Sequence, residues 1–145
     1  MKILISLALF MLCKFSFVTA SYAQDNFGSD VTEENIQSPN IRVIMFYSQN
    51  CPICEILRPK FYEALAAINQ DSLDIIIFDF TTNESLENTK NFAEEEQLQD
   101  ILRQFGTKTG FITIINKEGE IIERITQNDD VVEITEKLLA ATLDN

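Results

Sequence analysis

The sequence has no histidine and only 3 cysteines among its 145 residues. Without histidine the chain can form neither a Ser-His nor a Cys-His catalytic pair, and it has no imidazole ligand for a metal ion. Basic residues are also scarce, with 11 Lys and Arg against 23 Asp and Glu, which gives a formal net charge of −12. Because nucleic acids and anionic lipids both attract basic surfaces, this charge predicts that neither is a partner.

The N-terminal apolar run is short. It covers residues 3–13, whereas a membrane helix needs about 20 apolar residues. Small residues at Ser21 and Ala23 then precede Gln24, which is the spacing that signal peptidase prefers. We predict that residues 1–23 are a cleaved signal peptide. The alternative is an uncleaved anchor.

Cleavage would change the chemistry of the chain. It would remove two lysines and Cys13, so the exported chain would carry a net charge of −14 and two cysteines. Export implies an oxidising or redox-managed compartment, which is the periplasm if the source is a Gram-negative bacterium. Residues 24–40 are polar and predict a leader or linker, and residues 41–145 are long enough for one domain.

Hydrophobic patterns predict seven elements in that domain. Buried strands are expected at 41–47 and 73–80, a hairpin of strands at 111–115 and 120–125, and helices at 52–70, within 81–104 and after Asn128-Asp129-Asp130. A strand-helix-strand start implies a parallel pair, and the hairpin adds an antiparallel edge. The sequence therefore predicts an α/β fold with a central mixed sheet flanked by helices. Whether 81–104 forms one helix or two stays open at this point.

The chemistry of the chain is concentrated at Cys51-Pro52-Ile53-Cys54. Cys51 lies between a predicted buried strand and the first turn of a helix, where unpaired N–H groups and the helix dipole stabilise a thiolate. Cys54, one helical turn later, is expected to reach the same sulfur and to resolve a mixed disulfide formed by Cys51. Pro52 and Ile53 lie between the sulfurs, and we expect them to tune the reduction potential.

Two other interpretations of the cysteine pair are open. A purely structural disulfide across two residues would close a very small loop and contribute only about 2 kcal/mol. A zinc site needs about four ligands, and two thiolates without histidine fall short unless carboxylates or a second chain contribute. The placement of the motif between strand and helix favours redox chemistry, and we predict no metal site.

From these residues the chain resembles the thioredoxin superfamily over about residues 41–143. The resemblance rests on the strand at 41–47, on the Cys-Pro-Ile-Cys motif, and on Pro59, five residues after the second cysteine. It also rests on the segment 105–120, which matches the last strand pair of the family without a gap. In thioredoxins a proline at the position of Pro59 kinks the active-site helix, and we expect a kink here.

The chain departs from the thioredoxin pattern in several places. The ungapped match puts Phe111 where the family has a cis-proline that faces the dithiol, so we expect Gly110 and Phe111 to form the substrate groove. Met45 stands where thioredoxins carry a buried aspartate, and Asn50 replaces the tryptophan that often precedes the motif. The segment 81–104 is longer than its counterpart in plain thioredoxin.

The resemblance implies an exported thiol-disulfide oxidoreductase that reduces or isomerises protein disulfides. Its reactive group would be the Cys51–Cys54 disulfide, with no further cofactor. The implied partners are protein thiols and disulfides and a membrane or soluble redox partner, with the chain itself a monomer. The alternatives are a thioredoxin-like peptide-binding module with structural cysteines and a metal-binding dithiol protein.

Overall fold

A computed structural model describes residues 41–143, and the predicted signal peptide and polar leader lie outside the described residues. The elements are β1 (Ile41–Tyr47), α1 (Pro52–Ala66), β2 (Leu73–Asp79), α2 (Asn83–Glu95), α3 (Gln99–Phe105), β3 (Phe111–Asn116), β4 (Ile121–Thr126) and α4 (Val131–Leu143). Within these residues, no helix is both long and apolar enough to cross a membrane.

The strands form one sheet in the order β2-β1-β3-β4. β1 pairs in parallel with β2 and antiparallel with β3, and β3 pairs antiparallel with β4. The central strand β1 is almost wholly buried, as its nearly continuous apolar run predicts. The prediction of an α/β fold with a mixed sheet is therefore confirmed.

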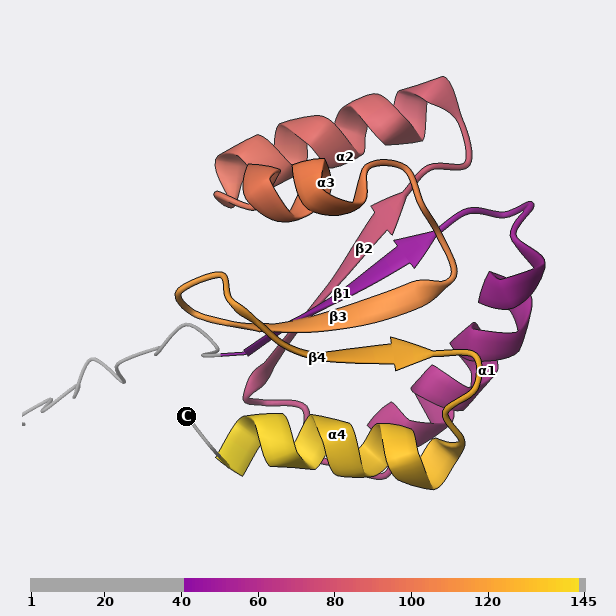
Figure 1. Cartoon of the computed structure of the whole chain (residues 1–145), viewed down its shortest axis with the longest axis vertical. Coiled ribbons are helices and arrows are strands. Elements are labelled where there is room, and N and C mark those ends of the chain that lie inside the picture. Colours follow the sequence, from indigo (N-terminus) through magenta and orange to yellow (C-terminus); the bar gives the residue numbers. More distant parts are fainter. Residues whose placement is uncertain (1–40, 144–145) are drawn as a thin grey trace, which may run out of the picture. The chain divides into compact units, whose positions relative to one another are not determined.

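Helices cover both faces of the sheet (Figure 1). On one face, α1 and α4 pack side chains such as Leu57 and Leu138 into a core that includes Met45. On the other face, α2 and α3 pack Ala93 and Ile101 into a second core. The alternation of side chains along β1 sends successive residues into the two cores in turn.

Helix α1 ends earlier than the sequence pattern suggested. We expected helix to Gln70, but α1 ends at Ala66. The side-chain amide of Gln70 donates to the Leu65 carbonyl at 2.9 Å and closes the helix end. Pro59 lies inside α1, and the helix continues through it.

The segment 81–104 forms two helices, which answers the question that the sequence left open. The chain turns between α2 and α3 at Gln97, whose φ of 60° is in the left-handed region. The Leu98 N–H donates to the Ala93 carbonyl at 2.7 Å and closes this turn. Gly106, with φ 61°, ends α3 as expected.

The C-terminal part follows the sequence prediction closely. In the hairpin, the Gly119 N–H donates to the Asn116 carbonyl at 3.0 Å, and Gly119 has a φ of 82°. At the start of α4, Asp130 accepts a hydrogen bond from the Glu133 N–H, and the Glu133 carboxylate accepts one from the Asp130 N–H. This reciprocal cap fixes where α4 begins.

Candidate active site

The cysteine motif caps the N-terminus of α1. Cys51 has an extended backbone, and its sulfur accepts a hydrogen bond from the Cys54 N–H at 3.1 Å. Pro52 is the first helical residue, where a missing N–H costs nothing. Cys51 thus occupies the N-cap position, at which the helix dipole favours negative charge. Both cysteines are thiols.

The two thiols differ in acidity. Burial of Cys51 opposes ionisation, but hydrogen bonds from the Cys54 and Thr109 side chains and from the backbone at Cys54 and Ile53 outweigh it. The pKa of the Cys51 thiol therefore lies below its ordinary value. Burial, together with the hydrogen bond to the Cys51 sulfur, raises the pKa of the Cys54 thiol. Cys51 is thus the thiol that ionises first.

Access to the two sulfurs differs in the same sense. Cys51 is 8% exposed, whereas Cys54 is fully buried. The Cys54 thiol donates to the Phe46 carbonyl at the end of β1, with a sulfur-to-oxygen distance of 3.7 Å. An incoming disulfide therefore meets Cys51 before Cys54, while Cys54 keeps its proton beneath it.

Gly110 brings the backbone before β3 against the motif. Its N–H donates to the Phe46 carbonyl at 2.9 Å, and its φ is 91°. A Cβ atom at this position would lie 2.7 Å from Ile53 Cγ2 and 3.4 Å from Cys51 Sγ. The structure therefore places two of the predicted site residues, Gly110 and Ile53, beside the reactive sulfur.

The side chain of Phe111, which we expected to help form the substrate groove, packs mainly in the core. Its side chain is 8% exposed and belongs to the core under α2 and α3. It stacks on Phe46 with ring centroids 4.5 Å apart, and the Arg124 guanidinium covers it at 4.5 Å. Phe111 pairs with Phe46 across the strands, which directs both rings to the same face of the sheet. The Phe111 side chain thus packs as core, and Gly110 makes the close approach to the motif. The described residues contain no cis peptide bond.

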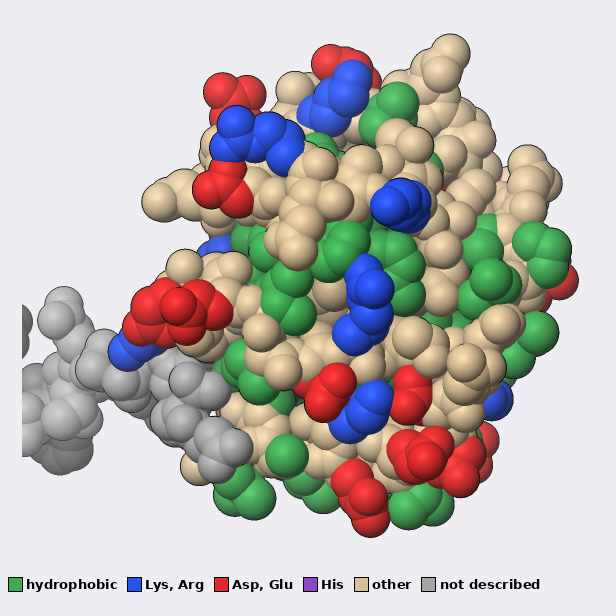
Figure 2. Space-filling view, in the orientation of Figure 1, with side chains coloured by type: hydrophobic (Ala, Val, Ile, Leu, Met, Phe, Trp, Pro, Cys, Tyr) green, Lys and Arg blue, Asp and Glu red, His purple; other side chains and the backbone are tan. Residues whose placement is uncertain are grey.

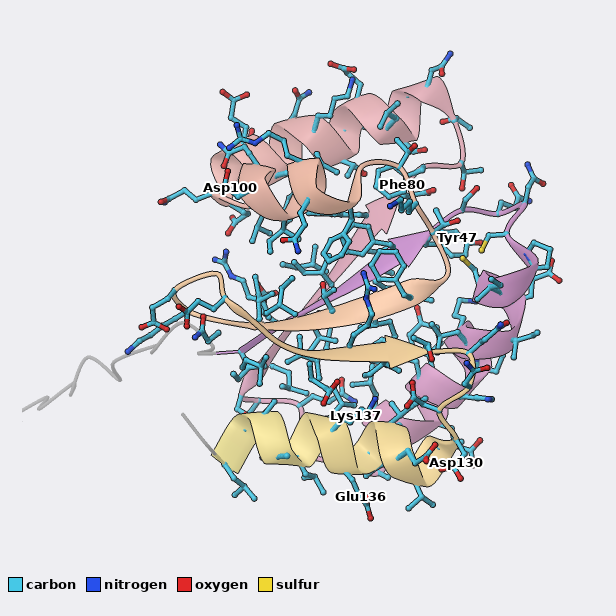
Figure 3. The ribbon with its side chains drawn as sticks, in the orientation of Figure 1. Tyr47, Phe80, Asp100, Asp130, Glu136 and Lys137 are labelled. Atoms are coloured by element: carbon cyan, nitrogen blue, oxygen red, sulfur yellow. The ribbon has the colours of Figure 1, made fainter. Side chains whose placement is uncertain are left out.

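A chain of hydrogen bonds holds the loop before Cys51. The Asp79 carboxylate accepts from both the N–H and the hydroxyl of Thr81. The Thr81 hydroxyl oxygen in turn accepts from the Gln49 N–H at 2.9 Å. These residues line a surface pocket of about 420 Å³ together with Tyr47, which Figure 3 shows near the start of α1. The end of β2 thereby fixes the approach to the motif.

Two basic residues of α1, Arg58 and Lys60, make contacts away from the sulfurs. Lys60 donates to the carbonyls of Gln127 and Asp129 at 2.8 and 2.9 Å. The Arg58 guanidinium lies over the Tyr47 ring, 5.5 Å from its centroid. Neither cation is among the groups that lower the pKa of Cys51. Within the described residues, no three His, Cys, Asp or Glu side chains gather in a cluster that could hold a metal ion.

Sequence reasoning missed two contributors to the site. The Thr109 side chain lowers the pKa of both thiols. The Phe46 carbonyl accepts hydrogen bonds from the Cys54 thiol and the Gly110 N–H. Neither has a sequence signature of its own, since a threonine before a glycine is common and every residue has a backbone carbonyl. The one available signal was position, because the resemblance of the segment 105–120 to the last strand pair of thioredoxins predicts Gly110 and Phe111 beside the motif.

Neither a protein-family model nor a curated protein matches the chain. Among solved structures, the chain is similar to a thioredoxin from Wuchereria bancrofti, with 15% identity over 75% of this chain and 83% of that one, at a TM-score of 0.50. It is also similar to StoA from Bacillus subtilis, with 15% identity over 70% and 84% of the two chains and a TM-score of 0.49. The likeness to MTB DsbF has 14% identity over 72% and 82% and a TM-score of 0.49.

The sheet order and the likeness to the Wuchereria bancrofti thioredoxin define the fold. The chain has the thioredoxin-like fold, with a Cys-x-x-Cys pair at the start of the first helix after the central strand. The prediction of the fold is confirmed.

Proposed function

We propose that the protein is an exported thiol-disulfide oxidoreductase that reduces or isomerises disulfides in other proteins. The observation that carries this proposal is the asymmetry of the two thiols. Cys51 is the more acidic and the less buried, and Cys54 lies beneath it with its proton held toward the Phe46 carbonyl. A nucleophile and a resolving thiol need this arrangement.

In the first step the Cys51 thiolate attacks one sulfur of a substrate disulfide. The substrate S–S bond breaks, a mixed disulfide between Cys51 and the substrate forms, and the second substrate sulfur leaves as a thiolate that takes up a proton. The lowered pKa of Cys51 increases the fraction of this thiol that is ionised at a given pH. The N-terminus of α1 stabilises the same charge.

In the second step Cys54 gives up its proton, and its thiolate attacks the Cys51 sulfur. The mixed disulfide breaks, the Cys51–Cys54 disulfide forms, and the substrate leaves as its second thiol after taking up a proton. The substrate gains two electrons and two protons, and the protein loses them. A dithiol donor, in a membrane or in solution, must then reduce the protein again. In isomerisation the substrate's own second thiol resolves the mixed disulfide instead.

The proposal includes the partners and the location expected from the sequence. The substrates are protein disulfides, the exported chain acts as a monomer, and the Cys51–Cys54 pair is the redox group without a further cofactor. The proposed location is the periplasm for a Gram-negative source.

Trapping of a mixed disulfide tests the proposal. Cys54→Ser keeps the nucleophile and removes the resolving thiol, so we expect it to accumulate covalent adducts with a disulfide-bonded peptide. Cys51→Ser keeps the buried thiol alone and should trap at least tenfold less, since Cys54 is fully buried and its pKa is raised. Equal trapping by both variants would contradict the assigned roles. Unchanged biological activity of Cys51→Ser would instead favour the peptide-binding module.

A further inference from the structure

Ile53 and Gly110 bound the space beside the Cys51 sulfur. A Cβ atom on Gly110 would lie 2.7 Å from Ile53 Cγ2, 2.8 Å from Ile53 Cβ and 3.4 Å from Cys51 Sγ. One point next to Gly110 is therefore in contact range of both the reactive sulfur and the branched part of the Ile53 side chain. Cys51 is only 8% exposed, so a disulfide must reach its sulfur past these two neighbours.

Both neighbours are held in place. The Gly110 N–H donates to the Phe46 carbonyl at 2.9 Å, which ties the backbone before β3 to the end of β1. Ile53 is the second residue of α1, and the two carbon substituents on its Cβ restrict its rotamers in a helix. The Cys51 sulfur itself accepts from the Cys54 N–H at 3.1 Å. The opening at the Cys51 sulfur is therefore narrow and stiff.

Thiol-disulfide exchange makes a steric demand on such an opening. The attacking sulfur approaches one sulfur of the disulfide from the side opposite its partner sulfur, and the rate depends on access. The carbon group on the attacked sulfur then comes close to whatever surrounds Cys51 Sγ. Ile53 is 37% exposed, so part of its side chain faces an incoming disulfide while Cγ2 lies against Gly110.

We propose that Ile53 is a specificity-determining residue that selects which disulfides Cys51 attacks. Its branched side chain admits disulfides whose sulfurs carry narrow, flexible substituents and excludes those whose sulfurs are crowded. Among protein disulfides, the accepted class is that of extended or unfolded segments, because a disulfide packed inside a folded domain keeps its neighbours around both sulfurs. This inference rests on the proposed function and deepens it by naming the substrate class.

Two small disulfides of equal charge measure this selection. Cystine has a CH₂ group next to each sulfur, and its branched homologue carries one added methyl group on each of these carbons. With either reagent, Cys51 and then Cys54 displace the two amino-acid thiolates, which take up the two protein thiol protons, and the protein dithiol becomes a disulfide. The rate constant for loss of protein thiols is divided by that of dithiothreitol with the same reagent, which removes the intrinsic difference between the reagents.

The preference for cystine over the branched reagent reports on access alone. A change in the reduction potential or the nucleophilicity of Cys51 alters both rates of one protein together and leaves their ratio unchanged. The measurement therefore separates a steric role of Ile53 from the tuning of the potential that we expect from the same residue.

Two variants of Ile53 differ in the atom that contacts Gly110, since Ile53→Ala removes Cγ2 and Ile53→Val keeps it. We expect the wild-type preference to exceed that of dithiothreitol by about tenfold, which is the discrimination that one methyl group gives in a tight site. Ile53→Ala should bring the preference to within about twofold of dithiothreitol, and Ile53→Val should keep it. Ile56→Ala, one turn later on α1 and 51% exposed, is the matched control. Alanine is a strong helix former and both positions are exposed, so these variants keep the fold.

The outcomes separate the two proposals. Loss of the preference in Ile53→Ala, with the preference kept in Ile53→Val and Ile56→Ala, supports the role of Ile53. If Ile53→Ala keeps the wild-type preference, or if Ile53→Val or Ile56→Ala loses it equally, the role of Ile53 is wrong while the proposed function stands. The same holds if the wild-type protein selects no better than dithiothreitol. A reduced wild-type protein that reacts with neither reagent overturns both proposals.

Discussion

Gly110 lies where a side chain would collide with the motif. Its φ of 91° is strained for any other residue, and a Cβ would meet Ile53 at 2.7 Å. We expect Gly110→Ala to lower the free energy of unfolding by about 3 kcal/mol, from backbone strain and overpacking together. Gly119→Ala is the matched control, since Gly119 has a φ of 82° but open space around it. We expect Gly119→Ala to lower the free energy of unfolding by only about 1 kcal/mol.

Urea denaturation of the two reduced variants measures this difference. Ile53→Ala in the Gly110→Ala background should recover part of the loss, because it removes the atoms that the new methyl group would meet. An equal loss for Gly110→Ala and Gly119→Ala would show that the packing against Ile53 contributes nothing.

At the residue scale, the sequence indicated the reactive pair and the approach of Gly110, because motif and spacing carry that information. It did not indicate that Thr109 lowers the pKa of both thiols, because Thr109 lies nearly sixty positions after Cys51 in the chain. It also did not indicate that the Phe111 side chain packs in the core under α2 and α3. The direction of that side chain depends on its register opposite Phe46, which only the assembled sheet fixes.

The chain turns between α2 and α3 at Gln97, a non-glycine residue in the left-handed region of backbone angles. Its φ of 60° costs energy for a residue with a Cβ. We expect Gln97→Gly to raise the free energy of unfolding by about 0.5 to 1 kcal/mol, and Gln97→Ala to give no such gain. Urea midpoints of the two variants check this. A gain of the same size in Gln97→Ala would mean that the glutamine side chain, and not the backbone angle, is the source.

The elements themselves were largely predictable. The β-branched runs of the strands and the turn around Gly119 follow from local sequence, and the parallel pair and the antiparallel edge follow from the lengths of the connections. The end of α1 and the break at Gln97 could not be predicted. Hydrogen bonds donated by Gln70 and Leu98 close these two turns, and neither residue type is a typical helix stop.

Asp129 connects the end of β4 to α4. Its carboxylate accepts from Lys137 Nζ at 2.8 Å and from the Thr126 N–H at 2.6 Å. Figure 3 shows Lys137 between α4 and β4, whereas Glu136 points away from the sheet. Burial opposes ionisation of Asp129, but the hydrogen bonds from Lys137 and Thr126 outweigh it, and the pKa of Asp129 is lowered.

A lowered pKa gives this carboxylate a defined pH dependence. Its stabilisation is complete above the ordinary aspartate pKa of about 3.9 and is lost as the pH falls through the folded value. We expect Asp129→Asn to cost about 1 to 3 kcal/mol at pH 7, and the difference from wild type to shrink below about pH 4. Asp100→Asn, at an exposed ion pair, should change stability by less than about 1 kcal/mol. A loss for Asp129→Asn that is constant from pH 7 to pH 3 would contradict this account.

At the scale of the whole molecule, the formal net charge is −12. On the face in Figure 2, basic side chains lie among acidic and uncharged ones.

If the chain is exported as proposed, the mature protein begins at Gln24, and intact mass together with N-terminal sequencing measures this. Ala23→Phe should block processing. Recovery of the wild-type protein from the membrane fraction with Met1 still attached would favour the uncleaved anchor.

The central claim concerns the cysteine pair, and its reduction potential tests it most directly. The protein without its signal segment would be equilibrated in glutathione and dithiothreitol buffers of known potential, and the fraction of Cys51–Cys54 disulfide measured by trapping free thiols. We expect a reversible two-electron transition within the monomer, near the thioredoxin value of about −270 mV for a reductase. A midpoint near about −120 mV would make the protein a disulfide donor and reverse the proposed direction. A pair that does not cycle between dithiol and disulfide would contradict the account itself.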